Sequence, residues 1–188
     1  MNNIYVKVYG DIPYNYREIL RYAGVTAPSG EIKDLLEECI AESDGIFQNK
    51  VCYGIFDYGG QITSVALSKN LEGCSRVILF AATVGIQLDR LIVKYSKLSP
   101  SKALMFQAIG AERIESLCNT FCNEMSKELD VRLKPRFSVG YGDLPLEVQK
   151  DIFRVLDCPR KIGLTLNDSL LMSPTKSVTA IVGIEDEF

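Results

Sequence analysis

The chain has 188 residues, of which 47% are hydrophobic, so it can bury a core large enough for one domain. Its 21 basic and 24 acidic residues give a net charge of −3 without any Lys/Arg run, which argues against nucleic acid as a partner. Histidine is absent, and this excludes Ser-His-Asp and Cys-His mechanisms. We expect a single domain over residues 1–188.

No part of the sequence suggests export or insertion into a membrane. No apolar stretch approaches the roughly 20 residues that span a bilayer, and residues 1–4 lack the basic start and apolar run of a signal peptide. We therefore expect a cytoplasmic protein without membrane contact. Its six cysteines are then expected to be free thiols, because a cytoplasmic chain with an adequate apolar core needs no disulfides.

The first quarter of the chain alternates strand and helix patterns. Residues 4–8 alternate apolar and polar side chains as a half-buried strand does, and a short helix is expected over Tyr16–Ala23. Residues 31–42 place apolar side chains at helical spacing with acidic residues opposite, which predicts an amphipathic helix resting on a sheet.

The next segments are rich in β-forming residues. The runs 51–57 and 62–67 are separated by Tyr58-Gly59-Gly60-Gln61, and we interpret them as a hairpin joined by a glycine-bearing turn. The continuous apolar run 77–82 is better suited to a central strand.

Two helices are predicted after Gly85, of which the second is unusually long. Ser99 and Pro100 have the residue types of an N-cap and a first helical position, so the second helix is expected over Ser101–Glu128. Its apolar face is marked by Ile114, Leu117, Cys118, Phe121, Cys122 and Met125. We expect it to be the central packing helix.

The last third is predicted to be a mixture of short elements. Residues 132–139 should be extended because of the proline at position 135, and a short helix should cover 146–156. Short strands are expected at 162–166, 170–172 and 178–182. The fold class that follows is α+β, with a mixed or antiparallel sheet and packed helices.

The segment Arg136-Phe137-Ser138-Val139-Gly140-Tyr141 has the residue types of a ligand site. The guanidinium of Arg136 can donate two parallel hydrogen bonds to a carboxylate. Gly140 lets the backbone approach a ligand closely, and Tyr141 adds an aromatic ring with a hydroxyl group. These groups could hold an amino-acid-bearing cofactor. The alternatives are a surface arginine paired with a nearby acid, and a glycine turn with a packed tyrosine before a helix.

The order of this motif and the blocks 162–169 and 172–178 resembles the S-adenosylmethionine-binding activation domain of cobalamin-dependent methionine synthase. The stretches 81–91 and 108–117 are also similar to that family. The resemblance covers residues 76–182 and is strongest after Arg136. Val139 departs from it, because proline is usual at that place, and the longer family members continue past the position of Phe188.

The resemblance implies a methionine synthase activation domain-like fold and a role in repairing oxidised cobalamin. Arg136 would hold the carboxylate of S-adenosylmethionine, Ser138 would offer backbone contacts, and Gly140 with Tyr141 would shape the adenosine end. The cobalamin would be carried by a methionine synthase subunit on which this chain acts in trans, with a flavoprotein as a possible electron donor. Glu115 lies near a region from which the family supplies acidic residues, but we do not include it in the site.

Other functions remain open at this stage. The chain could be a scaffold that has lost the ligand and only docks a corrinoid protein. An independent methyltransferase is weakly supported, since no Gly-x-Gly-x-x-Gly follows a strand. Cys118 and Cys122 could be metal ligands or redox thiols, but their place on the apolar face favours the core. We predict no catalytic residue and no metal site.

Overall fold

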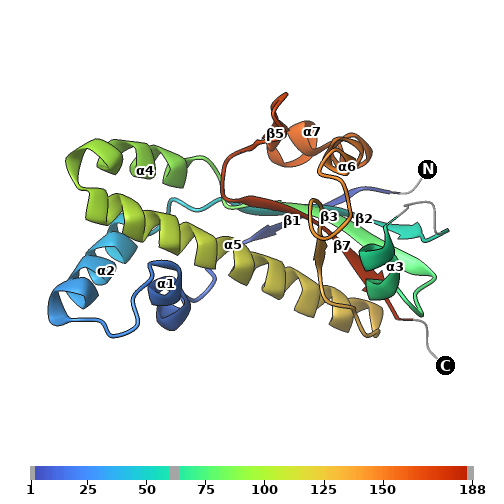
Figure 1. Ribbon diagram of the computed structural model, residues 1–188, viewed down its shortest axis with the longest axis horizontal. Coiled ribbons are helices and arrows are strands. Elements are labelled where there is room, and N and C mark those ends of the chain that lie inside the picture. Colours follow the sequence, from blue (N-terminus) through green and yellow to red (C-terminus); the bar gives the residue numbers. More distant parts are fainter. Residues whose placement is uncertain (1–2, 60–63, 186–188) are drawn as a thin grey trace.

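The computed structural model describes residues 3–59 and 64–185, which are built around a five-stranded sheet (Figure 1). The strand order is β1-β2-β3-β7-β4, and every pairing in it is antiparallel. The strands are β1 (Tyr5–Tyr9), β2 (Asn49–Asp57), β3 (Arg76–Thr83), β7 (Ser177–Ile184) and β4 (Phe137–Ser138). Two further strands, β5 (Thr165–Leu166) and β6 (Met172–Ser173), pair separately. The predicted α+β class is confirmed.

The central strands of the sheet are buried on both faces. Alternate residues of a strand point to opposite sides, so the apolar run of β3 supplies two cores at once. Ile78 and Phe80 join one apolar cluster, while Val77 and Ala81 join another on the opposite side. This is why the run was continuous in the sequence, and the prediction of a central strand is confirmed by its place in the middle of the sheet.

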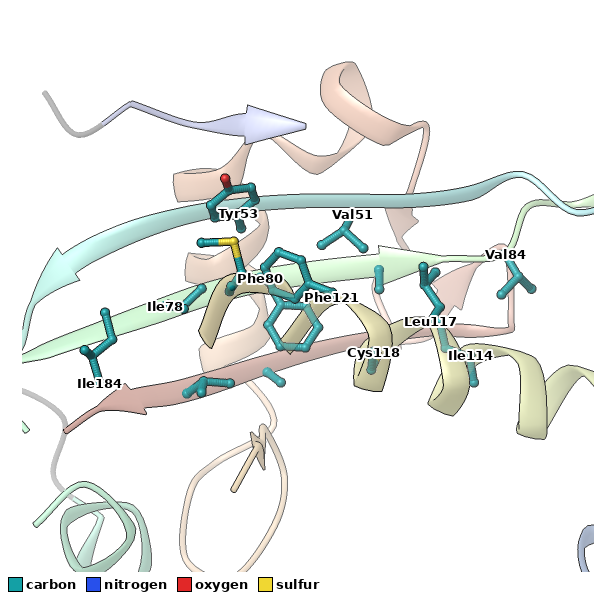
Figure 2. Packing of buried hydrophobic residues seen from close by; sticks show 14 residues of the cluster. Val51, Tyr53, Ile78, Phe80, Val84, Ile114, Leu117, Cys118, Phe121 and Ile184 are labelled. Atoms are coloured by element: carbon teal, nitrogen blue, oxygen red, sulfur yellow. The ribbon is translucent and has the colours of Figure 1, made fainter. Parts of the chain in front are cut away.

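One face of the sheet is covered by α5 (Pro100–Leu129), the long helix seen beneath the sheet in Figure 1. Ser99 is its N-cap residue, Pro100 opens it, and it ends at Asp130, whose φ of 52° is left-handed. Phe121 is fully buried, with its ring centroid 4.9 Å from that of Phe80 and 5.1 Å from that of Tyr53. Figure 2 shows these rings between the helix and the sheet. The prediction of a central packing helix is confirmed.

The remaining helices form two groups. The helices α1 (Tyr16–Tyr22), α2 (Gly30–Ser43) and α4 (Gln87–Leu98) pack around the first half of α5 and share an apolar cluster with it. The helices α3 (Val65–Asn70), α6 (Val148–Leu156) and α7 (Cys158–Ile162) contribute to the cluster on the opposite face of the sheet (Figure 1). The helices predicted near α1, α2, α4 and α6 are therefore confirmed, with ends that differ by a few residues. The expectation that the helix near α2 rests on the sheet is wrong, because its buried side chains pack against α5 and the neighbouring helices.

The predicted hairpin of 51–57 and 62–67 is wrong. The partners of β2 are β1 and β3, and the second predicted run enters the helix α3. The hydroxyl of Ser64 accepts a hydrogen bond from the Leu67 amide at 3.0 Å, and the Asp143 carboxylate accepts from the amides of Val65 and Ala66. These hydrogen bonds satisfy backbone amides that have no partner within the first turn of the helix. Their stabilisation of the helix outweighs the β propensity of the run. Residues 60–63 of the prediction lie outside the described residues.

Two of the last predicted strands are shorter and shifted. Ile162 ends α7 rather than starting a strand, and Gly163 with a φ of 71° terminates that helix. Leu170 has a φ of 62°, which is incompatible with a strand, so β6 begins two residues later. The third prediction, at 178–182, is confirmed within β7. Propensity alone did not reveal these two left-handed turns.

Candidate functional site

A surface pocket of 620 Å³ lies at the β4 edge of the sheet. Its volume falls within the roughly 300–1,000 Å³ of small-molecule sites. It is lined by Ala66, Lys69, Asn70, Arg136, Phe137, Ser138 and Tyr141. The predicted motif thus meets α3, which is about seventy residues away in the chain. Three of the four predicted site residues line this pocket, and Gly140 does not.

Arg136 reaches from β4 to the surface of α5. Its Nη2 lies 2.7 Å from Oε2 of Glu115, and its Nη1 donates to Oδ1 of Asn119 at 2.6 Å. The arginine side chain is 23% exposed, so most of it is buried, and it still lines the pocket. Burial opposes its charge, but the neighbouring Cys118 and Glu115 raise the pKa of Arg136 above its ordinary value. The residue therefore offers a permanent, oriented cation, and its acidic partner is Glu115.

The turn after β4 is closed by its own backbone. The amide of Gly140 donates to the Leu144 carbonyl at 3.1 Å, and the amide of Tyr141 donates to the Ser138 carbonyl at 3.2 Å. Ser138 also belongs to the ladder, in register with Ala180. The Ser138 carbonyl and the Gly140 amide, two groups of the segment from which the resemblance implies backbone contacts to the ligand, are therefore already engaged within the turn.

Gly140 has a structural reason for being glycine. Its φ is 84°, and a Cβ at this position would lie 3.0 Å from Cδ1 of Leu146. The turn it allows presents Tyr141, which is 68% exposed and whose ring meets that of Phe137 edge to face at 5.6 Å. Tyr141 consequently offers an open aromatic face at the rim of the pocket.

The sequence prediction missed the contribution of α3. Asn70 donates through Nδ2 to the Pro135 carbonyl at 3.4 Å, while its buried Oδ1 has no hydrogen-bond partner among the described residues. Lys69 adds a second cation to the wall. The signal that could have revealed this helix is Ser64, a good N-cap residue placed before an apolar run.

The downstream block 172–178 of the resemblance supports the fold rather than the pocket. The carboxylate of Asp89 at the start of α4 accepts from the amide of Thr175 at 2.8 Å and from its hydroxyl at 2.6 Å. The Ser177 hydroxyl donates to Thr83 at 2.8 Å. These contacts join the loop before β7 to the far end of the sheet, so the block 172–178 is structural.

The cysteines of α5 are core residues, as predicted. Burial raises the pKa of the Cys118 thiol to about 12, and it also raises that of Cys122. Neither is a thiolate at neutral pH, so neither suits metal binding or nucleophilic attack. Within residues 3–59 and 64–185, no group of three or more Cys, Asp or Glu side chains could hold a metal ion. None of the six cysteines, all of which lie in the described part of the chain, forms a disulfide.

A larger hollow of 1,080 Å³ borders this pocket and shares Lys69 with it. Its described lining residues include charged side chains, such as Arg132 and Lys134, and no aromatic ring; Lys134 is paired with Glu185 at 3.0 Å. The smaller pocket combines a guanidinium with an aromatic face, so we take it as the candidate site. In the described part of the chain, no helix is both long and apolar enough to cross a membrane.

Comparison with known proteins gives a match at the level of structure. The sequence matches no protein-family model and no curated protein. Among solved structures, the chain is similar to the reactivation domain of MetH bound to AdoHcy, with a TM-score of 0.68 and 12% sequence identity. The match covers 99% of this chain and 80% of that one. The fold is therefore that of the MetH reactivation domain, and the expected fold is confirmed.

Proposed function

We propose that this chain binds S-adenosylmethionine in the pocket at the β4 edge. The observation that carries the proposal is that Arg136, Ser138 and Tyr141 line one pocket in a fold shared with an AdoHcy-bound domain. AdoHcy is the demethylated form of S-adenosylmethionine and has the same amino-acid and adenosine ends. A site for one is therefore chemically suited to the other.

The residues present fit such a ligand. A carboxylate matches the planar fork of Arg136, and the ammonium group of the same amino acid matches Glu115 and the unpartnered Oδ1 of Asn70. On binding, the ion pair between Arg136 and Glu115 would be replaced by two others: Arg136 with the ligand carboxylate, and Glu115 with the ligand ammonium group. The exposed ring of Tyr141 can stack on adenine. Ser138 and Gly140 shape the turn that holds this ring.

We further propose that the chain supports reactivation of cobalamin in methionine synthase. When bound, S-adenosylmethionine supplies the methyl group for reductive methylation of the cobalt. The chain's own residues would orient this ligand toward a cobalamin-binding methionine synthase subunit, with a flavoprotein as electron donor. Positioning of this kind lowers the entropic part of a barrier. Six cysteines that form no disulfide support a cytoplasmic location for this work.

Isothermal titration with S-adenosylmethionine tests the binding proposal. Replacing Arg136 with alanine removes charge-assisted hydrogen bonds worth about 1.5–3 kcal/mol, so affinity should fall about 10- to 150-fold. Arg154→Ala is the matched control, because this arginine is 78% exposed and pairs with Asp151 on its own helix. Equal affinities in the native chain and Arg136→Ala would refute the proposed site.

A second candidate function is a docking subunit that binds no ligand. It is favoured by the closed pair of Arg136 with Glu115 and Asn119, which satisfies the guanidinium without a ligand. Capture of a purified cobalamin-loaded methionine synthase fragment by the immobilised chain distinguishes the two. Capture that is unchanged by S-adenosylmethionine and by Arg136→Ala supports the docking subunit. Capture that depends on both supports the ligand-binding module.

A further inference from the structure

A second pocket lies near the opposite edge of the sheet, where β1 ends. It has a volume of 360 Å³ and lies between the loop after β1, the segment between α2 and β2, and α5. None of its lining residues belongs to the pocket of Arg136. It is therefore independent of the function proposed above.

The innermost residue of this pocket is Arg113 of α5, which is only 2% exposed. Its Nη1 donates to the carbonyl of Ile12. Its Nε and Nη2 are buried and have no hydrogen-bond partner among the described residues. The adjacent carboxylate, Glu112, forms no ion pair with Arg113 among the described residues: its Oε1 accepts from the Asn15 amide and the Ser116 hydroxyl, while its buried Oε2 has no hydrogen-bond partner there. Arg113 is thus a buried cation without an acidic partner in the described part of the chain.

The two free nitrogens form one edge of the guanidinium. Nε–H and Nη2–H point in parallel along this edge, and their spacing matches the two oxygens of a carboxylate. A buried charged donor that lacks a partner carries an unrecovered desolvation cost, so an anion at this edge would be strongly favoured. The bond of Nη1 to Ile12 holds the group so that this edge remains available.

The walls around Arg113 indicate what kind of anion fits. The guanidinium carbon lies 3.9 Å from the ring centroid of Tyr14 and 5.0 Å from that of Phe47, so an apolar body can lie against aromatic faces. The exposed carboxylates of Asp11 and Asp44 also line the pocket and repel multiply charged anions more strongly than a monoanion. The amide oxygen of Asn49, another lining residue, is buried and has no hydrogen-bond partner among the described residues.

We propose that this pocket binds a small monocarboxylate with an apolar or aromatic body, held by the Nε and Nη2 edge of Arg113. The ring of Tyr14 covers the cation and must swing aside to admit the ligand. Its hydroxyl makes only a long contact of 3.4 Å with Ser43, and the stacking of its ring on Arg113 is replaced by the hydrogen bonds of the guanidinium to the carboxylate.

Titration of the whole chain with 3-phenylpropionate tests the proposal, with 3-phenylpropanamide and inorganic phosphate as comparison probes. The carboxylate should bind saturably with a Kd of about 1 mM or tighter, and the amide and phosphate at least about tenfold more weakly. In NMR spectra, the Nε–H signal of Arg113 should shift with the carboxylate and not with the amide. Equal responses to acid and amide, tighter binding of phosphate, or no saturation would overturn the proposal without any variant.

Substitutions in the two pockets show which of them binds 3-phenylpropionate. Arg113→Lys keeps the charge but loses the two-donor edge, so affinity for 3-phenylpropionate should fall at least about tenfold, whereas Arg154→Ala should bind as the native chain does. Unchanged affinity in Arg113→Lys would contradict the proposal. Loss of binding in Arg136→Ala with retention in Arg113→Lys would assign the probe to the other pocket and equally overturn it.

Discussion

The packing of α5 on the sheet can be tested by truncating Phe121. This side chain is fully buried and contacts the rings of Phe80 and Tyr53 at 4.9 and 5.1 Å. Phe→Ala changes in cores lower the free energy of unfolding by about 3–5 kcal/mol. Because Phe121→Ala also removes two aromatic contacts, we expect a loss of about 4–5 kcal/mol. At about 2–4 °C per kcal/mol for a chain of this length, Tm should fall by about 8–20 °C.

Urea unfolding followed by circular dichroism measures this loss of stability. The control is Leu104→Ala on the same helix, whose side chain is 55% exposed and whose truncation should change stability by no more than about 0.5 kcal/mol. A loss below about 1.5 kcal/mol for Phe121→Ala, or an equal loss for both variants, would show that the helix is not seated on the sheet as described.

Three more predictions concern other contacts. Gly110→Ala should destabilise the chain by about 1–2 kcal/mol in urea unfolding, because its Cβ would lie 2.5 Å from Cδ2 of buried Leu88; a more stable variant would refute the close approach of α4 and α5. Hydrogen bonds from Ser64 and the amides of α3 lower the pKa of Asp143 in the folded chain. The ionised carboxylate therefore stabilises the folded chain fully above the ordinary pKa of aspartate, and this stabilisation is lost as the pH falls through the lowered pKa. The difference in urea midpoint between the native chain and Asp143→Asn should therefore shrink as the pH falls below about 4, and a difference that grows toward acid would contradict this. At pH 8 the Cys118 thiol, with a pKa of about 12, should not react with a thiol reagent in the native chain although all six thiols react after unfolding; rapid native labelling at Cys118, mapped by mass spectrometry, would count against its burial.

The elements that the sequence predicted well are those with a long, regular apolar pattern. The face of α5 repeats over many turns, and the β3 run is apolar at every position, so both could be assigned without tertiary information. The start of α3 has only one local signal, the N-cap residue Ser64, because its other cap is Asp143, which lies almost eighty residues away in the sequence. Local propensity was overridden there by a long-range hydrogen bond.

The candidate site was predictable only in part, for a similar reason. Arg136 and Tyr141 lie in one short motif and could be selected together. The partners that set their environment, Glu115 on α5 and Asn70 on α3, are brought to them by the fold. Single-sequence reasoning has no spacing rule that joins such distant residues, so Glu115 was set aside and Asn70 was missed.

The most direct test of the central claim is to map S-adenosylmethionine onto the chain by backbone amide NMR. We expect saturable shifts for the amides of Lys69, Asn70, Ser138 and Tyr141, which line the pocket, and no shifts for Asp89 and Thr175 at the far end of the sheet. Shifts confined to other surfaces, or no saturable shifts at all, would contradict the account.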